Sequence, residues 1–265
     1  MFIEKIKDNH FRKRFEEARE IWQKRNSGDL SVGAVDPETL ELAKELRAPF
    51  LPPSKIIHID KKIEYSDNLA VPNEVLDYFI KEASHRVIAN FCGCRDMSNC
   101  KDYPIGLGCM FLGEASRGIH PEFAHPASIE EALEHAQRWR EAGLVIHLGY
   151  VPYDARFFEV GPANRLMSIC GCCPCCCVSR FIQYHRMPGI EVRVSGSCNG
   201  CGICLKACPY GLIEIQGEKA QVALKCIACG RCVDTCPEKA IEVTVVDPDY
   251  VQKTIEWVSG KVDVT

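Results

Sequence analysis

A cysteine motif that occurs twice constrains this chain more than any other feature of its sequence. The run C-x2-C-x2-C-x3-C-P occupies residues 198–209 and recurs at 226–237, an offset of 28 residues. The similarity continues beyond the cysteines, since Ile213 and Ile241 stand at the same distance after the two runs. Each half predicts a strand, a cysteine loop with a helical turn, and a second strand. Two such halves predict a small pseudo-symmetric unit.

The repeat resembles the two-cluster bacterial ferredoxins, and every cysteine of their pattern is present. In that pattern, three cysteines of one run bind a [4Fe–4S] cube and the last cysteine serves the other cube. The expected ligands are therefore, for one cluster, Cys198, Cys201, Cys204 and Cys236, and for the other, Cys226, Cys229, Cys232 and Cys208. A pair of zinc sites fits poorly, because zinc takes closed tetrahedral sets without the third C-x2-C step.

All 18 cysteines fall in three groups, at residues 92–109, 170–177 and 198–236. A secreted disulfide framework is one explanation, but the first 17 residues have neither the apolar core nor the cleavage site of a signal peptide. No apolar run approaches the ~20 residues that span a bilayer. We therefore expect a cytoplasmic protein without a transmembrane segment, in which reducing conditions favour metal binding over disulfides.

The first cysteine group follows the pattern C-x-C-x5-C-x8-C and supplies as many thiolates as one cube needs. Its members are Cys92, Cys94, Cys100 and Cys109. The pattern predicts a third iron–sulfur cluster, with zinc and a redox-active or structural thiol set as alternatives. Arg95, inside the group, would place a positive charge near the cluster and favour its reduced state.

The second cysteine group has six cysteines within residues 170–177, more than one ligand run requires. Cys170, Cys173 and Cys176 are the candidate ligands of a further cluster, built here or shared with residues 92–109. The other cysteines would then pack or serve a neighbouring cluster. An exposed dithiol for thiol chemistry and plain buried cysteines are the alternatives.

The two upstream groups and the repeat together resemble a group of largely uncharacterised 4Fe–4S binding proteins of anaerobes. The similarity rests on a C-x-C-R motif, a capped helix and a cysteine-rich run ahead of the ferredoxin repeat, over residues 85–245. It implies redox work without naming a substrate. The widely spaced Cys-Cys pairs of heterodisulfide reductases are not found here, so their activity is not expected.

The predicted fold class is α+β, in four parts. Residues 1–70 are expected to form an N-terminal amphipathic helix and an extended arm with a short helix near 38–46, and residues 71–189 a mainly helical, cysteine-rich domain. Residues 190–246 are expected to form the ferredoxin-like βαββαβ domain, and residues 247–265 a tail. Within the second part, a capping box at Ser128 starts a helix that Gly143 ends, and 144–148 is a strand.

The charge of the chain excludes partners that need a strong electrostatic field. Its 32 basic and 36 acidic residues give a formal charge of −4, which does not favour nucleic acid. The leading hypothesis is a non-catalytic electron-transfer subunit of an oxidoreductase complex, with two ferredoxin clusters, one or two further Fe–S clusters and a redox partner protein. The alternative is a reductase whose cysteine-rich domain carries a catalytic cluster or dithiol that the ferredoxin domain supplies with electrons.

Overall fold

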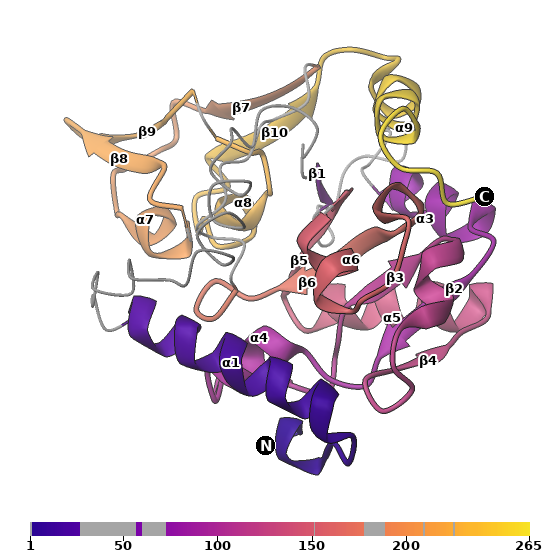
Figure 1. Ribbon diagram of the computed structural model, residues 1–265. Coiled ribbons are helices and arrows are strands. Elements are labelled where there is room, and N and C mark those ends of the chain that lie inside the picture. Colours follow the sequence, from indigo (N-terminus) through magenta and orange to yellow (C-terminus); the bar gives the residue numbers. More distant parts are fainter. Residues whose placement is uncertain are drawn as a thin grey trace, which may run out of the picture.

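The computed structural model describes residues 2–26, 57–59, 73–150, 152–177, 189–208, 210–224 and 226–265. These residues mix helices and strands. A six-stranded sheet with its helices lies beside a smaller unit that holds the cysteine repeat (Figure 1). The short helix predicted near 38–46, and the arm apart from strand β1 (Ile57–Ile59), lie outside the described residues.

The large sheet is antiparallel throughout, with the strand order β1-β5-β6-β3-β2-β4. Its further strands are β2 (Arg86–Ala89), β3 (Met110–Leu112), β4 (Ala124–Pro126), β5 (Val145–Tyr150) and β6 (Met167–Cys172). The sequence predicts a mainly helical domain here with one strand at 144–148, so the sheet is a correction to that prediction. Most of these strands are short, and β6 contains glycine and cysteine, so their periodicity is weak.

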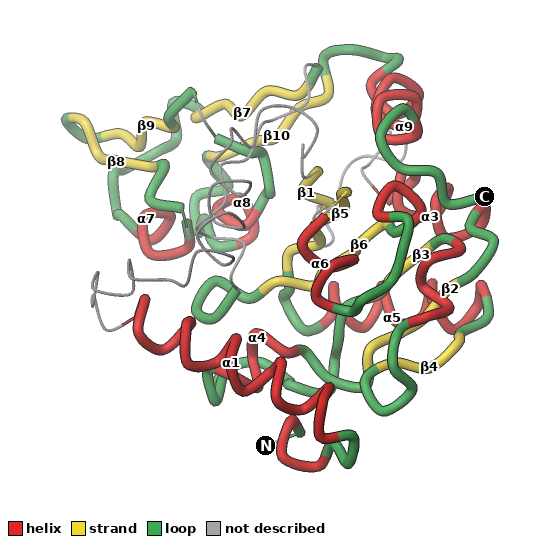
Figure 2. The backbone as a smooth tube through the Cα atoms, viewed as in Figure 1, coloured by secondary structure: helices red, strands yellow, loops and turns green. Residues whose placement is uncertain are grey.

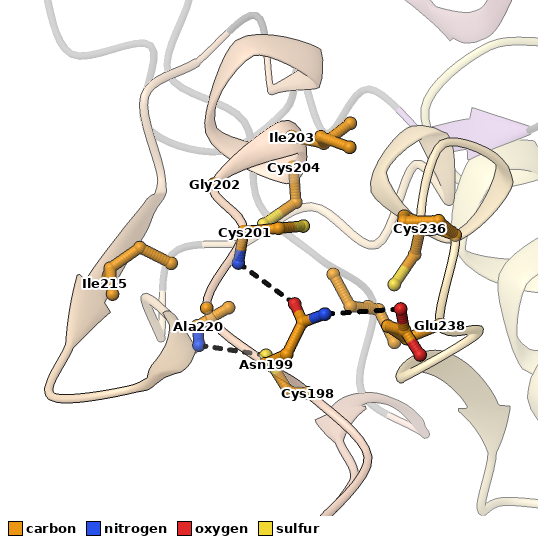
Figure 3. Close-up of a pocket in the computed structure, with 13 residues that line it drawn as sticks. Cys198, Asn199, Cys201, Gly202, Ile203, Cys204, Ile215, Ala220, Cys236 and Glu238 are labelled. Atoms are coloured by element: carbon orange, nitrogen blue, oxygen red, sulfur yellow. Dashed lines mark hydrogen bonds between the residues drawn. The ribbon is translucent and has the colours of Figure 1, made fainter.

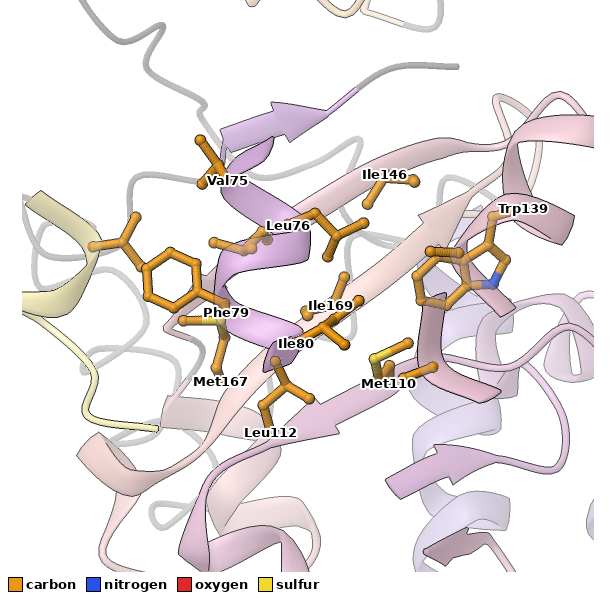
Figure 4. Packing of buried hydrophobic residues seen from close by; sticks show 14 of the residues in the cluster. Val75, Leu76, Phe79, Ile80, Met110, Leu112, Trp139, Ile146, Met167 and Ile169 are labelled. Atoms are coloured by element: carbon orange, nitrogen blue, oxygen red, sulfur yellow. The ribbon is translucent and has the colours of Figure 1, made fainter. Parts of the chain in front are cut away.

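Both faces of the sheet are buried, because alternate residues along its central strands enter different hydrophobic cores. On β2, Ile88 faces one core while Val87 and Ala89 face the other. Helices α3 (Asn73–Glu82), α5 (Ile129–Glu141) and α9 (Tyr250–Ser259) cover the first face. Figure 4 shows this packing around Phe79, Met110 and Trp139. Residues 247–265, predicted as a tail, thus include a helix that packs on α3.

The second face is covered by the N-terminal segment, which contains η1 (Ile3–Lys5) and α1 (Asn9–Asn26). The predicted helix begins at Asn9 because the carboxylate of Asp8 accepts a 2.8 Å hydrogen bond from the Phe11 amide and so caps it. Buried Asp96 accepts hydrogen bonds from the amides of Phe2 and Ile3. The N-terminus is thereby held on α4 (Gly93–Met97), the short helix that carries the first cysteines.

Helix α5 confirms the predicted capping box, since Ser128 and Glu131 exchange side-chain and backbone hydrogen bonds. Its Trp139 is fully buried and donates a hydrogen bond to the carbonyl of Gly108. The indole also lies against Gly171 on β6, where a Cβ atom would stand 2.5 Å from the ring. Helix α5 is therefore packed directly on the strand that leads into the second cysteine group.

The cysteine repeat forms a unit of its own, with the element order β7-α7-β8-β9-α8-β10. The bounds are β7 (Ile190–Val194), α7 (Ile203–Ala207), β8 (Ile213–Gln216), β9 (Lys219–Val222), α8 (Arg231–Asp234) and β10 (Ile241–Val245). Strand β7 pairs with β10 and β8 pairs with β9, both antiparallel (Figure 2). Gly202 and Gly230 precede the two helices with φ of 75°, a backbone conformation that favours glycine.

No helix among the residues described has the length and apolar character that crossing a membrane requires.

Candidate metal centres

The first hollow of the repeat unit is lined by Cys198, Cys201, Cys204 and Cys236, the four cysteines predicted to share one cluster. Figure 3 shows these four cysteines among the residues that line the hollow. The backbone amides of Ala220 and Ala240 point at the sulfurs, each 3.3 Å from the Sγ atom of Cys198 or Cys236, respectively. Such amides stabilise thiolate ligands, so this hollow fits a [4Fe–4S] cluster.

The second hollow has the same plan, and the cysteines that line it are Cys208, Cys226, Cys229 and Cys232. The Leu212 amide donates to Cys208 Sγ at 3.4 Å, as the amide of Ala240 does to Cys236 in the other half. Both tetrads combine three cysteines of one run with the last cysteine of the other run. The structure therefore brings together the two sets that the sequence predicts.

The two hollows differ in their distance from solvent. In the first, Cys201 is exposed, and the apolar side chains of Ile203 and Leu205 on α7 are exposed beside it. In the second, three of the four cysteines are buried, and burial raises the pKa of the Cys232 thiol to about 12. The first hollow thus faces outwards, whereas the second faces the rest of the protein.

The structure places one cysteine of the first upstream group beside three cysteines of the second. Cys100, predicted to share a site with Cys92, Cys94 and Cys109, lies with Cys173, Cys175 and Cys176, and the four sulfurs are all within 4.8 Å of one another. Cys100 Sγ is 3.7 Å from Cys175 Sγ, which is 3.5 Å from Cys176 Sγ. This tight tetrad joins the loop after α4 to the turn after β6.

The remaining upstream cysteines form a second, elongated series of thiols at the end of β6. Cys94 contacts Cys92, Cys92 contacts Cys109, and Cys109 contacts Cys170. Cys170 in turn contacts Cys172, whose Sγ lies 2.7 Å from Cys177 Sγ. The hydrogen bond from Cys109 holds the pKa of the Cys92 thiol well below its ordinary value. We define these six residues as the thiol series.

Arg95 lies between the tight tetrad and the thiol series, and it is 1% exposed. Its guanidinium donates to the carbonyl oxygens of Gly171, at 2.7 Å, and Leu107. Burial opposes its charge, but the neighbouring thiols of Cys92 and Cys109 outweigh that effect and raise the pKa of Arg95. A buried cation at this position favours thiolates around it.

Hydrogen bonds of two side chains, Tyr210 and Arg231, join the repeat unit to the upstream domain, and the sequence did not predict either of them. Tyr210, which lines the second hollow, has its hydroxyl 3.3 Å from His147 Nε2, and His147 hydrogen-bonds to Cys172. Arg231, at the start of α8, donates to the Gly143 carbonyl at 2.9 Å and to the Tyr103 hydroxyl. These residues come from separate elements. Their contacts therefore depend on strand pairing, which local sequence patterns do not predict.

Comparison with known proteins agrees with the geometry of the repeat unit. Residues 197–241 match the family model of the 4Fe-4S dicluster domain. No curated protein and no solved structure matches this chain. The chain therefore contains a 4Fe-4S dicluster domain, which supports iron–sulfur chemistry and at least one [4Fe–4S] cluster.

Proposed function

We propose that this chain is an electron-transfer protein in which two [4Fe–4S] clusters relay single electrons between an outside redox partner and the cysteine-rich upstream domain. The observation that carries the proposal is the contact between Tyr210, in the wall of the second hollow, and His147, beside the thiol series. Bound [4Fe–4S] clusters supply one-electron chemistry. The protein's own residues set where that chemistry takes place.

The cysteines of the repeat hold each cluster at a fixed place between solvent and the protein interior. The tetrad of Cys198, Cys201, Cys204 and Cys236 forms the outer site, where exposed Ile203 offers an apolar contact for a partner protein. The tetrad of Cys208, Cys226, Cys229 and Cys232 forms the inner site. Electrons would thus enter or leave at the outer site and pass to the inner one.

The inner site is excluded from water on its upstream side. Val145 of β5 packs there against Ile227 and Cys229 of the second cysteine run, with Tyr210 beside them. Apolar packing of this kind lowers the local dielectric constant and tunes cluster potentials. The hydroxyl of Tyr210 and the ring of His147 then connect this site to Cys172 by hydrogen bonds.

Iron and acid-labile sulfide in anaerobically purified protein test this proposal. We expect about eight of each per chain, since each cube holds four. Cys204→Ala and Cys232→Ala should each lower the content by about half. Iron well below eight in the unmodified chain, with no loss in these variants, would contradict the ligand assignment.

The rate of electron exchange with an added acceptor tests which of the two cluster sites exchanges electrons with an outside partner. The protein, reduced with dithionite under anaerobic conditions, should pass electrons to an added one-electron acceptor and recover its visible absorption. Cys201→Ala should slow this exchange more than Cys226→Ala does, because the outer site faces solvent. Equal slowing by the two variants would show that the acceptor does not distinguish the sites.

A second candidate function, a reductase, is favoured by the 2.7 Å contact between Cys172 and Cys177. Oxidation of two thiols to a disulfide releases two electrons and two protons, and the clusters would return the electrons one at a time. Both side chains are buried, at 7% and 6% exposed, so a substrate would need an opening of this region. Differential alkylation with mass spectrometry should find a 172–177 disulfide in oxidised protein if this candidate is correct.

A further inference from the structure

The sulfurs of the tight tetrad stand too close together to hold a cube. We propose that Cys100, Cys173, Cys175 and Cys176 bind a single zinc ion in a tetrahedral site that contains no inorganic sulfide. This site is independent of the two clusters in the repeat unit. It also differs from the cluster assignment that the sequence suggests for these cysteines.

The distances between the thiolate sulfurs distinguish a site for a single metal ion from a site for a [4Fe–4S] cube. Four thiolates around zinc, at Zn–S bonds of about 2.3 Å, stand roughly 3.8 Å apart at the corners of a tetrahedron. The sulfur–sulfur distances of 3.7 Å (Cys100 to Cys175) and 3.5 Å (Cys175 to Cys176) agree with that edge, and all four sulfurs fall within 4.8 Å of one another. A cube places its thiolates on four separate irons, so they must be farther apart.

The ferredoxin tetrads of the same structure provide an internal comparison. Among the residues that the structure describes, the tight tetrad is the one group of three or more candidate metal ligands whose ligand atoms all lie within 4.8 Å. The eight cysteines around the two hollows are described, and neither of their sets is as compact. The chain therefore contains two kinds of four-cysteine site.

Backbone amides support the sulfurs of the tight tetrad as they do in zinc-binding loops. Cys100 Sγ accepts hydrogen bonds from the amides of Asp102 and Tyr103, two and three residues later. Cys173 Sγ accepts one from the amide of Cys176. These donors orient the sulfurs and offset part of the charge of four thiolates on one divalent ion.

Zinc at this position would have a structural role, because four protein ligands leave no open coordination position. Cys100 belongs to the loop after α4, and the other three belong to the turn after β6, so the ion joins two segments that are about 75 residues apart in sequence. The same loop carries Tyr103, whose hydroxyl accepts a hydrogen bond from Arg231. The zinc site thus fixes part of the surface on which the repeat unit sits.

Elemental analysis of the full chain, expressed with iron and zinc both supplied and purified without oxygen, tests this site. We expect about one zinc per chain. Cys175→Ser should lose most of the zinc and keep the iron and sulfide of the unmodified protein. Cys170→Ser is the matched control, since it changes a cysteine of the same run outside the tetrad, and it should keep the zinc.

X-ray absorption at the zinc edge on the unmodified protein gives a test that does not depend on folding of a variant. A shell of four sulfurs at about 2.3 Å supports the site. Protein without zinc, or zinc bound through nitrogen and oxygen, overturns it. Loss of about four irons in Cys175→Ser would instead assign a cube to these cysteines, and loss of about one would assign a single iron. Either loss leaves the two clusters of the repeat unit unaffected, so it is distinct from failure of the electron-transfer proposal.

Discussion

Asp154, in the first turn of α6 (Pro152–Phe157), carries a carboxyl group that the fold holds in an unfavourable environment. Burial raises its pKa to about 6, although Ser168 Oγ donates a hydrogen bond to it. A raised pKa in the folded protein means that the stabilising contribution is complete below pH 3.8 and is lost as the pH rises through 6. At neutral pH this residue therefore destabilises the fold.

Asp154→Asn should stabilise the protein at pH 8 by roughly 1–2 kcal/mol, because the amide keeps an oxygen for Ser168 and carries no charge. The gain should shrink as the pH is lowered to 5. Thermal unfolding followed by circular dichroism at pH 5, 6.5 and 8 measures it. Asp249→Asn changes an exposed carboxylate and serves as the control. A gain that does not depend on pH would contradict the burial argument.

Single residues also show what the sequence could and could not predict about the sites. The eight cysteines of the repeat were assigned from their spacing together with its resemblance to the pattern of two-cluster ferredoxins. The proximity of Cys100 to Cys175 and Cys176 was not predicted, since these partners lie 75 and 76 residues away in sequence. A thiol's partner in such a case depends on strand pairing, and the spacing of cysteines does not contain that information.

Secondary-structure elements also differ in whether the sequence could predict them. Helix α5 was predictable because a capping box and an apolar stripe are local signals. The six-stranded sheet was not predictable, since its pairs join distant segments and β3 has three residues. Packing across elements adds a further constraint: the ring of Trp139 occupies the space where Gly171 would carry a side chain.

Gly171→Ala should therefore destabilise the fold by roughly 1–3 kcal/mol, because the added methyl group overlaps the buried indole. The Gly171 carbonyl also accepts a hydrogen bond from Arg95, so displacement of β6 would disturb the buried cation. The midpoint of thermal unfolding measures the loss. Gly106→Ala is the matched control, since a Cβ there meets nothing within 4 Å. Equal losses in both variants would show that the Trp139 contact is not the cause.

At the scale of the whole molecule, the position of the repeat unit decides whether its inner site reaches the upstream thiols. Three contacts set that position: apolar packing of Val145 on Ile227, the pair of Tyr210 and His147, and the Arg231 side chain. Arg231 also lies 5.8 Å from the centre of the Tyr103 ring, which adds a cation–π contact. Arg231 thus joins the inner site to the loop that follows the zinc ligand Cys100 in our proposal.

Arg231→Met should loosen this interface without removing a cluster ligand. The variant loses hydrogen bonds to Gly143 and Tyr103, which contribute on the order of 1–2 kcal/mol, so amide hydrogen exchange around those residues should speed up about tenfold. Arg193→Met is the control, because Arg193 is exposed and pairs with Glu191 on its own strand. Iron content should match that of the unmodified chain in both variants. If Arg231→Met left both amide hydrogen exchange and the rate of electron exchange with an added acceptor unchanged, the apolar packing of Val145 and the contact of Tyr210 with His147 would suffice to hold the repeat unit, and the relay would not need this arginine.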